Sequence, residues 1–183
     1  QGVPLPDSTS RMAADFEYLR TDLNWVRKLG DGARLDIKGA ATYSGNESDT
    51  RRLAFNAQGD TALNSVTLAD ADEIGYTTTG KYSAPIGDGH SFAMGWDGGY
   101  ADRDDGKQRR ETGLPDAFPI NSDEDFAAEV ARFAMYGQDE WAITKNLSVY
   151  FGARWEGIRT TSSGNTFATT TSRTSVWSPL FHT

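Results

Sequence analysis

The feature that most constrains this sequence is an alternation of apolar and polar residues with a period of two. It is clearest at residues 147–155, and it recurs at 35–43 and 92–100 and less regularly at 19–25, 74–82 and 133–143. Successive side chains of a β-strand point to opposite faces. Each run therefore predicts a strand with one apolar and one polar face. With a further strand starting near Ser172, the sequence predicts an all-β, antiparallel meander of about seven strands. Each strand is expected to span roughly 12–17 residues, more than the ~9–11 that cross a bilayer.

Two places break this pattern. Phe16 and Tyr18 fall on the opposite parity from Leu19 and Trp25, and a β-bulge would reconcile them. Asp139 shares its parity with Trp141, so the pattern puts a carboxylate on a face that is otherwise apolar.

The amino-acid composition is compatible with a β-sheet that has one apolar face and one polar face in contact with water. Hydrophobic residues make up 37% of the chain and mean hydropathy is −0.58, yet aromatic residues reach 11%. Disordered chains are usually poor in aromatics. No run of about 18 apolar residues exists, which excludes a transmembrane helix. A net charge of −8 argues against nucleic-acid binding, and the lack of cysteine removes disulfides and thiolate metal sites.

Connections are predicted to alternate between short and long. Tight turns are expected at Gly30-Asp31-Gly32, at Gly87-Asp88-Gly89 and around Lys145-Asn146, because Gly and Asn tolerate the positive φ of hairpin turns. Polar stretches at 47–72, 104–125 and 162–172 are predicted to be long loops. Outer-membrane barrels combine short periplasmic turns with long extracellular loops, so this alternation favours such a barrel.

Tyr and Trp are placed as two aromatic belts would require. Trp25, Tyr82 and Trp141 come shortly before the tight turns, whereas Tyr43, Tyr100 and Trp155 lie toward the other end of their strands. Amphipathic rings gather at the two interfaces of a membrane. The alternative, that these are core aromatics of a soluble β-sandwich, stays open on spacing alone.

The two parities give two sets of predicted positions. The lipid-facing set is Leu35, Ile37, Phe92, Met94, Trp96, Val149, Phe151 and Trp155. The set facing the lumen is Lys38, Gln138, Glu140, Arg154 and Glu156. We expect a cross-strand ion pair between Glu140 and Arg154. Seven strands with two open edges are untenable in lipid, so the sequence predicts part of a larger barrel.

Candidates for chemistry are weak. His90 and His182 are the two histidines and no catalytic motif accompanies them, so no enzyme activity and no cofactor are predicted. His90 is interpreted as a solvated turn residue. Acidic clusters occur at 70–73, 102–105 and 123–125, and Asp70 to Gly75 begins like a calcium loop but lacks an oxygen ligand at its fifth position. Solvated surface charge is the interpretation, with a loop-bound cation or a contact to a cationic substrate as the alternatives.

Residues 133–157 carry a more specific pattern. Phe133 to Trp141 includes Tyr-Gly-Gln-Asp-Glu-Trp, and Leu147 to Glu156 ends in Gly-Ala-Arg-Trp-Glu. This resembles the Y-x-Q-D-x-W…L-x-x-x-x-G-x-R-x-E hairpin of TonB-dependent receptor barrels, with Ala153 in place of the common Leu. Ser175-Val-Trp-Ser-Pro-Leu180 is similar to the strand that follows. For residues 1–126 the resemblance to the family consists only of the regular succession of predicted strands and connections.

The resemblance implies a barrel of 22 strands around an N-terminal plug, with ligand bound between plug and loops and energy supplied by a TonB–ExbB–ExbD complex. Residues 1–183 are then expected to be a partial barrel, without the plug and without either barrel end. Gln1 to Pro6 lacks the pattern of a signal peptide, and residues 1–11 are expected to end an extracellular loop. Phe181-His182-Thr183 lacks a terminal aromatic residue.

The function implied is active import of a ferric siderophore or a similar bulky nutrient across the outer membrane of a Gram-negative bacterium. The lumen set would dock the plug, and the stretches 47–72 and 104–125 would set specificity. A passive porin or another large barrel is the first alternative. A soluble all-β binding module is the second.

Overall fold

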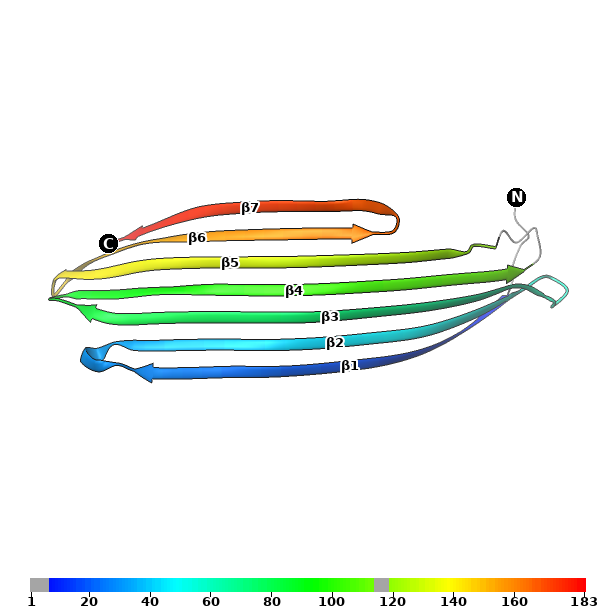
Figure 1. The fold of residues 1–183 in the computed structure, drawn as a ribbon, viewed down its shortest axis with the longest axis horizontal. Coiled ribbons are helices and arrows are strands. Elements are labelled where there is room, and N and C mark those ends of the chain that lie inside the picture. The colour runs from blue at the N-terminus through cyan, green and yellow to red at the C-terminus, as the bar shows by residue number, and fades with distance from the viewer. Residues whose placement is uncertain (1–6, 114–118) are drawn as a thin grey trace.

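The chain forms a single antiparallel sheet in the computed structural model, which describes residues 7–113 and 119–183 (Figure 1). The strands follow one another as a meander, β1-β2-β3-β4-β5-β6-β7, so the predicted fold class is confirmed. Their bounds are β1 Asp7–Lys28, β2 Arg34–Phe55, β3 Thr61–Ile86, β4 His90–Gly113, β5 Ser122–Thr144, β6 Leu147–Gly164 and β7 Phe167–His182. A 3-10 turn, η1 (Gly30–Gly32), joins β1 to β2.

Six of the seven strands are longer than predicted, at 18 to 26 residues, and β7 with 16 residues lies within the predicted range. The predicted loops at 47–72 and 162–172 are wrong, because both stretches are hairpins whose connections are only 56–60 and 165–166. Likewise β4 continues to Gly113, and β7 begins at Phe167 rather than near Ser172. Backbone hydrogen bonds pair polar and apolar residues alike, so the ladder continues where the apolar alternation stops.

Parts of two expectations lie outside the described residues. They are residues 1–6 of the expected loop end and residues 114–118 of the predicted loop 104–125. Residues 7–11, also expected in that loop end, belong to β1.

The three tight turns are confirmed and lie at one end of the sheet (Figure 1). Asp31 and Gly32 have φ of 59° and 79°, and Gly87 and Gly89 have φ of 57° and 83°. At Gly89 a side chain would also collide with the neighbouring strand, since a Cβ there would lie 2.8 Å from the carbonyl oxygen of Ala142. Glycine is therefore required at this turn for both conformation and space.

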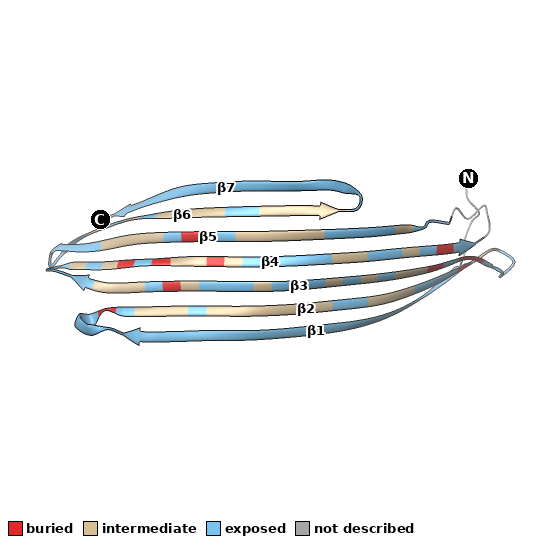
Figure 2. Cartoon of the chain, in the orientation of Figure 1, coloured by how far each residue is buried: buried red, intermediate tan, exposed pale blue. Residues whose placement is uncertain are grey.

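The sheet is one layer with both faces open (Figure 2). Within the described ranges no large side chain is fully buried, and the buried apolar residues are four alanines in the central strands together with Ala33 and Leu63. β1 and β7 are exposed along their whole length. Among the described residues no helix is long and apolar enough to span a membrane. The sheet has no hydrophobic core of its own.

Register assigns every side chain to a face, because directly paired residues of neighbouring strands share one face. One row of paired residues crosses the whole sheet and is rich in tryptophan, and we call it the tryptophan row. Its members are Trp25, Ile37, Gly80, Trp96, Met135, Trp155 and Trp177. We call the face of these residues the apolar face and the opposite one the polar face.

Candidate functional site: the two faces of the wall

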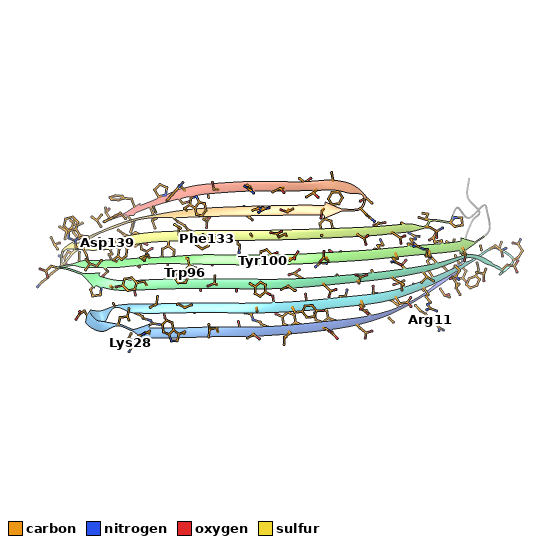
Figure 3. The ribbon with its side chains drawn as sticks, viewed as in Figure 1. Arg11, Lys28, Trp96, Tyr100, Phe133 and Asp139 are labelled. Atoms are coloured by element: carbon orange, nitrogen blue, oxygen red, sulfur yellow. The ribbon has the colours of Figure 1, made fainter. Side chains whose placement is uncertain are left out.

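All thirteen residues predicted to face lipid or to form the aromatic belts lie on the apolar face. The register connects them, since Tyr82 pairs with both Leu35 and Met94, and Trp141 pairs with Val149. Trp96 and Tyr100 lie four residues apart on this face of β4, with Gly98 between them (Figure 3). Phe151 is 48% exposed, so it packs in no closed core. The sequence pattern therefore sorted these side chains correctly, and their contact with lipid remains a proposal.

The five residues predicted to face the lumen share the polar face. The expected ion pair between Glu140 and Arg154 is wrong, however. Glu140 is opposite Tyr150 and Arg154 is opposite Tyr136, so the two charges are four residues apart along the sheet, about 13 Å. Arg154 instead donates to Glu156, two residues away on its own strand, at 2.5 Å.

This local pairing recurs along the polar face and is the main feature that sequence reasoning missed. An arginine and a carboxylate two residues apart lie on the same side of a strand. The pairs are Arg20–Asp22, Arg34–Asp36, Arg103–Asp105, Arg109–Glu111 and Arg154–Glu156. The sequence does contain a sign of these pairs, because the pattern Arg-x-Asp or Arg-x-Glu recurs along it. Most of these pairs are solvent-exposed, so each contributes little to stability.

The two predicted aromatic belts run parallel to each other and oblique to the strands. We call the tight-turn end of the sheet the lower end and the opposite end the upper end. In the upper belt Tyr43 lies six residues above the tryptophan row, Tyr100 lies four residues above it, and Trp155 lies within it. In the lower belt Trp25 lies in the row, Tyr82 two residues below and Trp141 six below. Each belt thus shifts by six residues, about 20 Å, over four strand spacings of about 4.8 Å. Both belts are inclined by about 45° to the pairing direction, close to the ~35–45° strand tilt of membrane barrels.

An independent boundary on the apolar face has the same slant. It is formed by the first charged residue that each strand carries on this face above the upper belt. From β2 to β7 this residue comes closer to the tryptophan row, from ten residues at Glu47 to four at Arg173. The full set is Glu17, Glu47, Asp72, Asp102, Glu129, Arg159 and Arg173. Glu17 on the edge strand β1 is the exception to the slant, because it lies eight residues from the row rather than farther than Glu47. A level plane that cuts tilted strands produces such a shift, whereas a soluble sheet has no reason to show one.

Aromatic rings fill glycine positions within this wall. A Cβ at Gly80 would lie 2.0 Å from the Trp96 ring, so the indole rests on the backbone of β3. Its Nε1–H donates to Thr78 Oγ1 at 3.3 Å. On the polar face the Tyr136 ring occupies the space above Gly95 in the same way. Glycine in a strand accepts an aromatic neighbour that any side chain would displace.

The structure corrects the interpretation of His90 and accounts for Asp139. His90 is the first residue of β4, and its Nδ1 lies 2.7 Å from Asp139 Oδ2 while its ring stacks on Trp141 at 5.2 Å. Asp139 is only 13% exposed and lies near the tight-turn end of β5 (Figure 3). The imidazole of the neighbouring strand β4 partners Oδ2 and so reduces the cost of a carboxylate on the apolar face, whereas Oδ1 is buried without a hydrogen-bond partner among the described residues.

Phe16 and Tyr18 need no bulge. β1 and β2 pair without any register shift, so both rings lie on the polar face, stacked with their centroids 6.4 Å apart. The bulge that would have placed them with Leu19 and Trp25 is therefore not present between β1 and β2.

The acidic clusters are located on strands rather than in loops. Asp70 and Asp72 lie on β3, Asp102 and Asp104 on β4, and 123–125 on β5. Alternation puts directly adjacent acids, such as Asp72 and Glu73, on opposite faces, whereas Asp72 and Asp104 are paired on the apolar face. Within the described ranges no three His, Asp or Glu side chains converge on a possible metal position.

One buried carboxylate organises the connection before β5. Glu111 is 2% exposed and accepts a hydrogen bond from Arg109 Nε at 2.8 Å. The Ile120 backbone N–H donates to its Oε2 at 2.7 Å, and the Glu111 N–H donates to Asn121 Oδ1 at 3.0 Å. Burial by itself would raise the pKa of this carboxyl, but the Ile120 N–H and Arg109 hold its pKa below the usual value. No motif marked Glu111 in the sequence.

Comparison with known proteins gives one family. A family model described as "TonB dependent receptor-like, beta-barrel" matches residues 3–181. Two solved structures are similar, each to part of its length. The ferric citrate transporter FecA in its unliganded form is 18% identical, with 81% of this chain and 24% of that one covered and a TM-score of 0.41. The alcaligin outer-membrane receptor FauA from Bordetella pertussis is 16% identical, with 93% and 29% covered and a TM-score of 0.35. No curated protein matches the sequence significantly. The chain thus spans roughly a quarter of the length of these receptors.

Proposed function

The chain belongs to the TonB-dependent receptor β-barrel family, and from this premise we propose that it is a stretch of wall in an outer-membrane active importer. Members of this family are transporters and receptors rather than enzymes. In the complete protein this wall would surround a plug domain and take energy from a TonB–ExbB–ExbD complex. The cargo proposed is a ferric siderophore or a nutrient of similar bulk.

The observation that carries the proposal is the slanted apolar band. An apolar face bounded by parallel aromatic belts at about 45° is what a level membrane requires of tilted strands. The lipid-facing set would then meet acyl chains, and Trp25, Tyr43, Tyr82, Tyr100 and Trp141 would lie at the two interfaces. The polar face, with Lys38, Gln138, Glu140, Arg154 and Glu156, would face the lumen and the plug.

Charges placed in the middle of the band test this assignment. Phe151 lies midway between Leu147 and Trp155, and Met94 lies within the corresponding part of β4. In the full-length receptor, Met94→Lys and Phe151→Lys are each expected to disfavour membrane assembly by about 2–4 kcal/mol, because a midplane cation on the lipid side is costly. The measurement is the fraction of receptor recovered folded in the outer membrane.

Tyr150→Lys is the matched control, since Tyr150 neighbours Phe151 but lies on the polar face. It is expected to assemble nearly as well as the unaltered protein. Equal recovery of Phe151→Lys and Tyr150→Lys would contradict the assignment of the two faces.

Transport separates the importer from the porin alternative. Uptake of a labelled ferric siderophore by cells that carry the full-length protein is expected to disappear when TonB is deleted. A passive porin would instead admit small solutes in both strains. TonB-independent entry would therefore overturn the proposed energised import.

A further inference from the structure

Two arginines oppose each other directly on the apolar face. Arg159 of β6 pairs with Arg173 of β7, four residues above the paired Trp155 and Trp177. Both side chains are exposed, and neither forms an ion pair with any described residue. Like charges that face each other across a strand pair are destabilising.

No carboxylate among the described residues of β5, β6 and β7 pairs with these two arginines. Glu129, the carboxylate closest in register, is opposite Thr161 and so lies one diagonal position from Arg159. The chain as a whole has a net charge of −8, which makes two directly opposed arginines unusual. Two guanidinium groups side by side match the oxygens of a phosphate, which arginine binds in a bidentate manner.

Below the arginines the apolar face has a groove. Its volume is about 590 Å³ and its lining has no charged residue. Phe92, Met94, Met135 and Trp177 are among the side chains that form it, over a floor of Gly137 and Ala153. A Cβ at Gly137 would meet nothing within 4 Å, whereas Gly80 on the same face is filled by Trp96. The floor of this groove is thus open.

The groove leads toward the arginines. It crosses the sheet from Tyr82 on β3 to Trp177 on β7, four strand spacings or about 19 Å. Because the strands are inclined by about 45°, this path starts at the lower aromatic belt, where Tyr82 lies, passes Gly137 within the band and reaches the upper edge of the band at β7. From Trp177 to Arg173 is four residues, about 13 Å, past the small side chain of Ser175.

We propose that Arg159, Arg173 and this groove form a binding site for one anionic lipid. Its phosphate lies between the two guanidinium groups and one acyl chain lies over Gly137 and Ala153. The site rests on the proposed function, because it requires the apolar face to be in contact with lipid. Charge complementarity selects a lipid phosphate for the upper part, and the uncharged lining selects hydrocarbon for the lower part.

The test uses the full-length receptor in detergent, titrated with phosphatidylglycerol whose acyl chains carry bromine. Bromine quenches tryptophan emission on contact, and the difference between the receptor and its Trp177→Phe variant isolates Trp177. Quenching is expected to saturate with phosphatidylglycerol and to require about tenfold more brominated phosphatidylcholine, a difference of about 1.4 kcal/mol.

Variants address the two parts separately. Arg159→Gln with Arg173→Gln is expected to weaken binding of phosphatidylglycerol about tenfold or more, and Gly137→Leu is expected to weaken both lipids. The matched controls are Arg132→Gln on the polar face and Gly39→Leu elsewhere on the apolar face, and both are expected to bind as the unaltered receptor.

Several results would overturn the site. Quenching that rises without saturation and ignores all variants means ordinary solvation by lipid. Displacement by inorganic phosphate together with indifference to Gly137→Leu means a free-anion site. Trp177 emission that depends on receptor concentration rather than on lipid means a second copy. If the apolar face does not meet lipid at all, no brominated lipid quenches Trp177, and the proposed function fails as well.

Discussion

At the scale of single residues, close contacts between glycine and aromatic rings give the wall its local shape. The Trp96 ring occupies the side-chain space of Gly80 and the Tyr136 ring that of Gly95, one pair on each face. The Arg-x-acid pairs of the polar face are equally local, each formed within one strand. Such contacts depend on the neighbour two residues away or directly opposite, and on little else.

The Gly80 contact yields a prediction for stability. In the full-length receptor Gly80→Ala is expected to lower unfolding stability by about 1–3 kcal/mol, because the new Cβ overlaps the Trp96 ring and must displace it. Gly39→Ala is the control, since its Cβ would have a normal contact of 3.6 Å. Thermal unfolding followed by tryptophan emission measures both. A Gly80→Ala receptor as stable as Gly39→Ala would show that the indole has other room.

At the scale of elements, extended hairpins replace the predicted loops. β2 and β3 continue together to the turn at 56–60, far past the charged boundary of the apolar band. The apolar band therefore occupies only the part of each strand nearer the tight turns. The rest of each strand extends beyond the apolar band as a polar sheet. There the hydrogen bonds of Glu111 connect β4 to Ile120 and Asn121, just before β5.

Those contacts predict a pH dependence. The pKa of Glu111 is lowered in the folded protein, so its stabilisation is present above the ordinary glutamate pKa of about 4.3 and is lost as pH falls through the lower, folded value. Hydrogen exchange at the Ile120 amide is expected to stay slow from neutral pH to about pH 5 and to lose its protection in stronger acid.

Glu111→Gln is expected to make exchange of the Ile120 amide faster already at neutral pH, because a neutral carboxamide oxygen is a weaker acceptor than a carboxylate. Glu124→Gln, which removes an exposed carboxylate of β5, serves as its control. Unchanged exchange at Ile120 in Glu111→Gln would show that this hydrogen bond does not hold the connection.

At the scale of the whole molecule, a sheet with two open edges and no core predicts dependence on further strands. β1 and β7 expose backbone donors and acceptors over 22 and 16 residues. Residues 1–183 expressed alone are expected to associate through these edges rather than to fold as a monomer. Sedimentation of the chain in detergent, beside the full-length receptor refolded identically, measures this. A monomeric, protease-resistant sheet would contradict it.

Alternation of period two was sufficient to identify strands, faces and tight turns, because a strand's geometry ties sequence parity directly to direction. For that reason Met94, Phe151 and Arg154 were assigned to the correct faces from the sequence. Strand ends were missed, since hydrogen-bond ladders do not require an apolar face and leave no alternation in polar stretches.

Everything that depends on register needed the folded sheet. The pairing of Arg159 with Arg173, the partner of Asp139 and the slant of the belts follow from which residues stand opposite each other. Register is a relation between residues far apart in the chain, set by the turns and by packing across the whole sheet. The sequence of one strand does not specify its register with the neighbouring strand. These features were therefore visible only in the folded sheet.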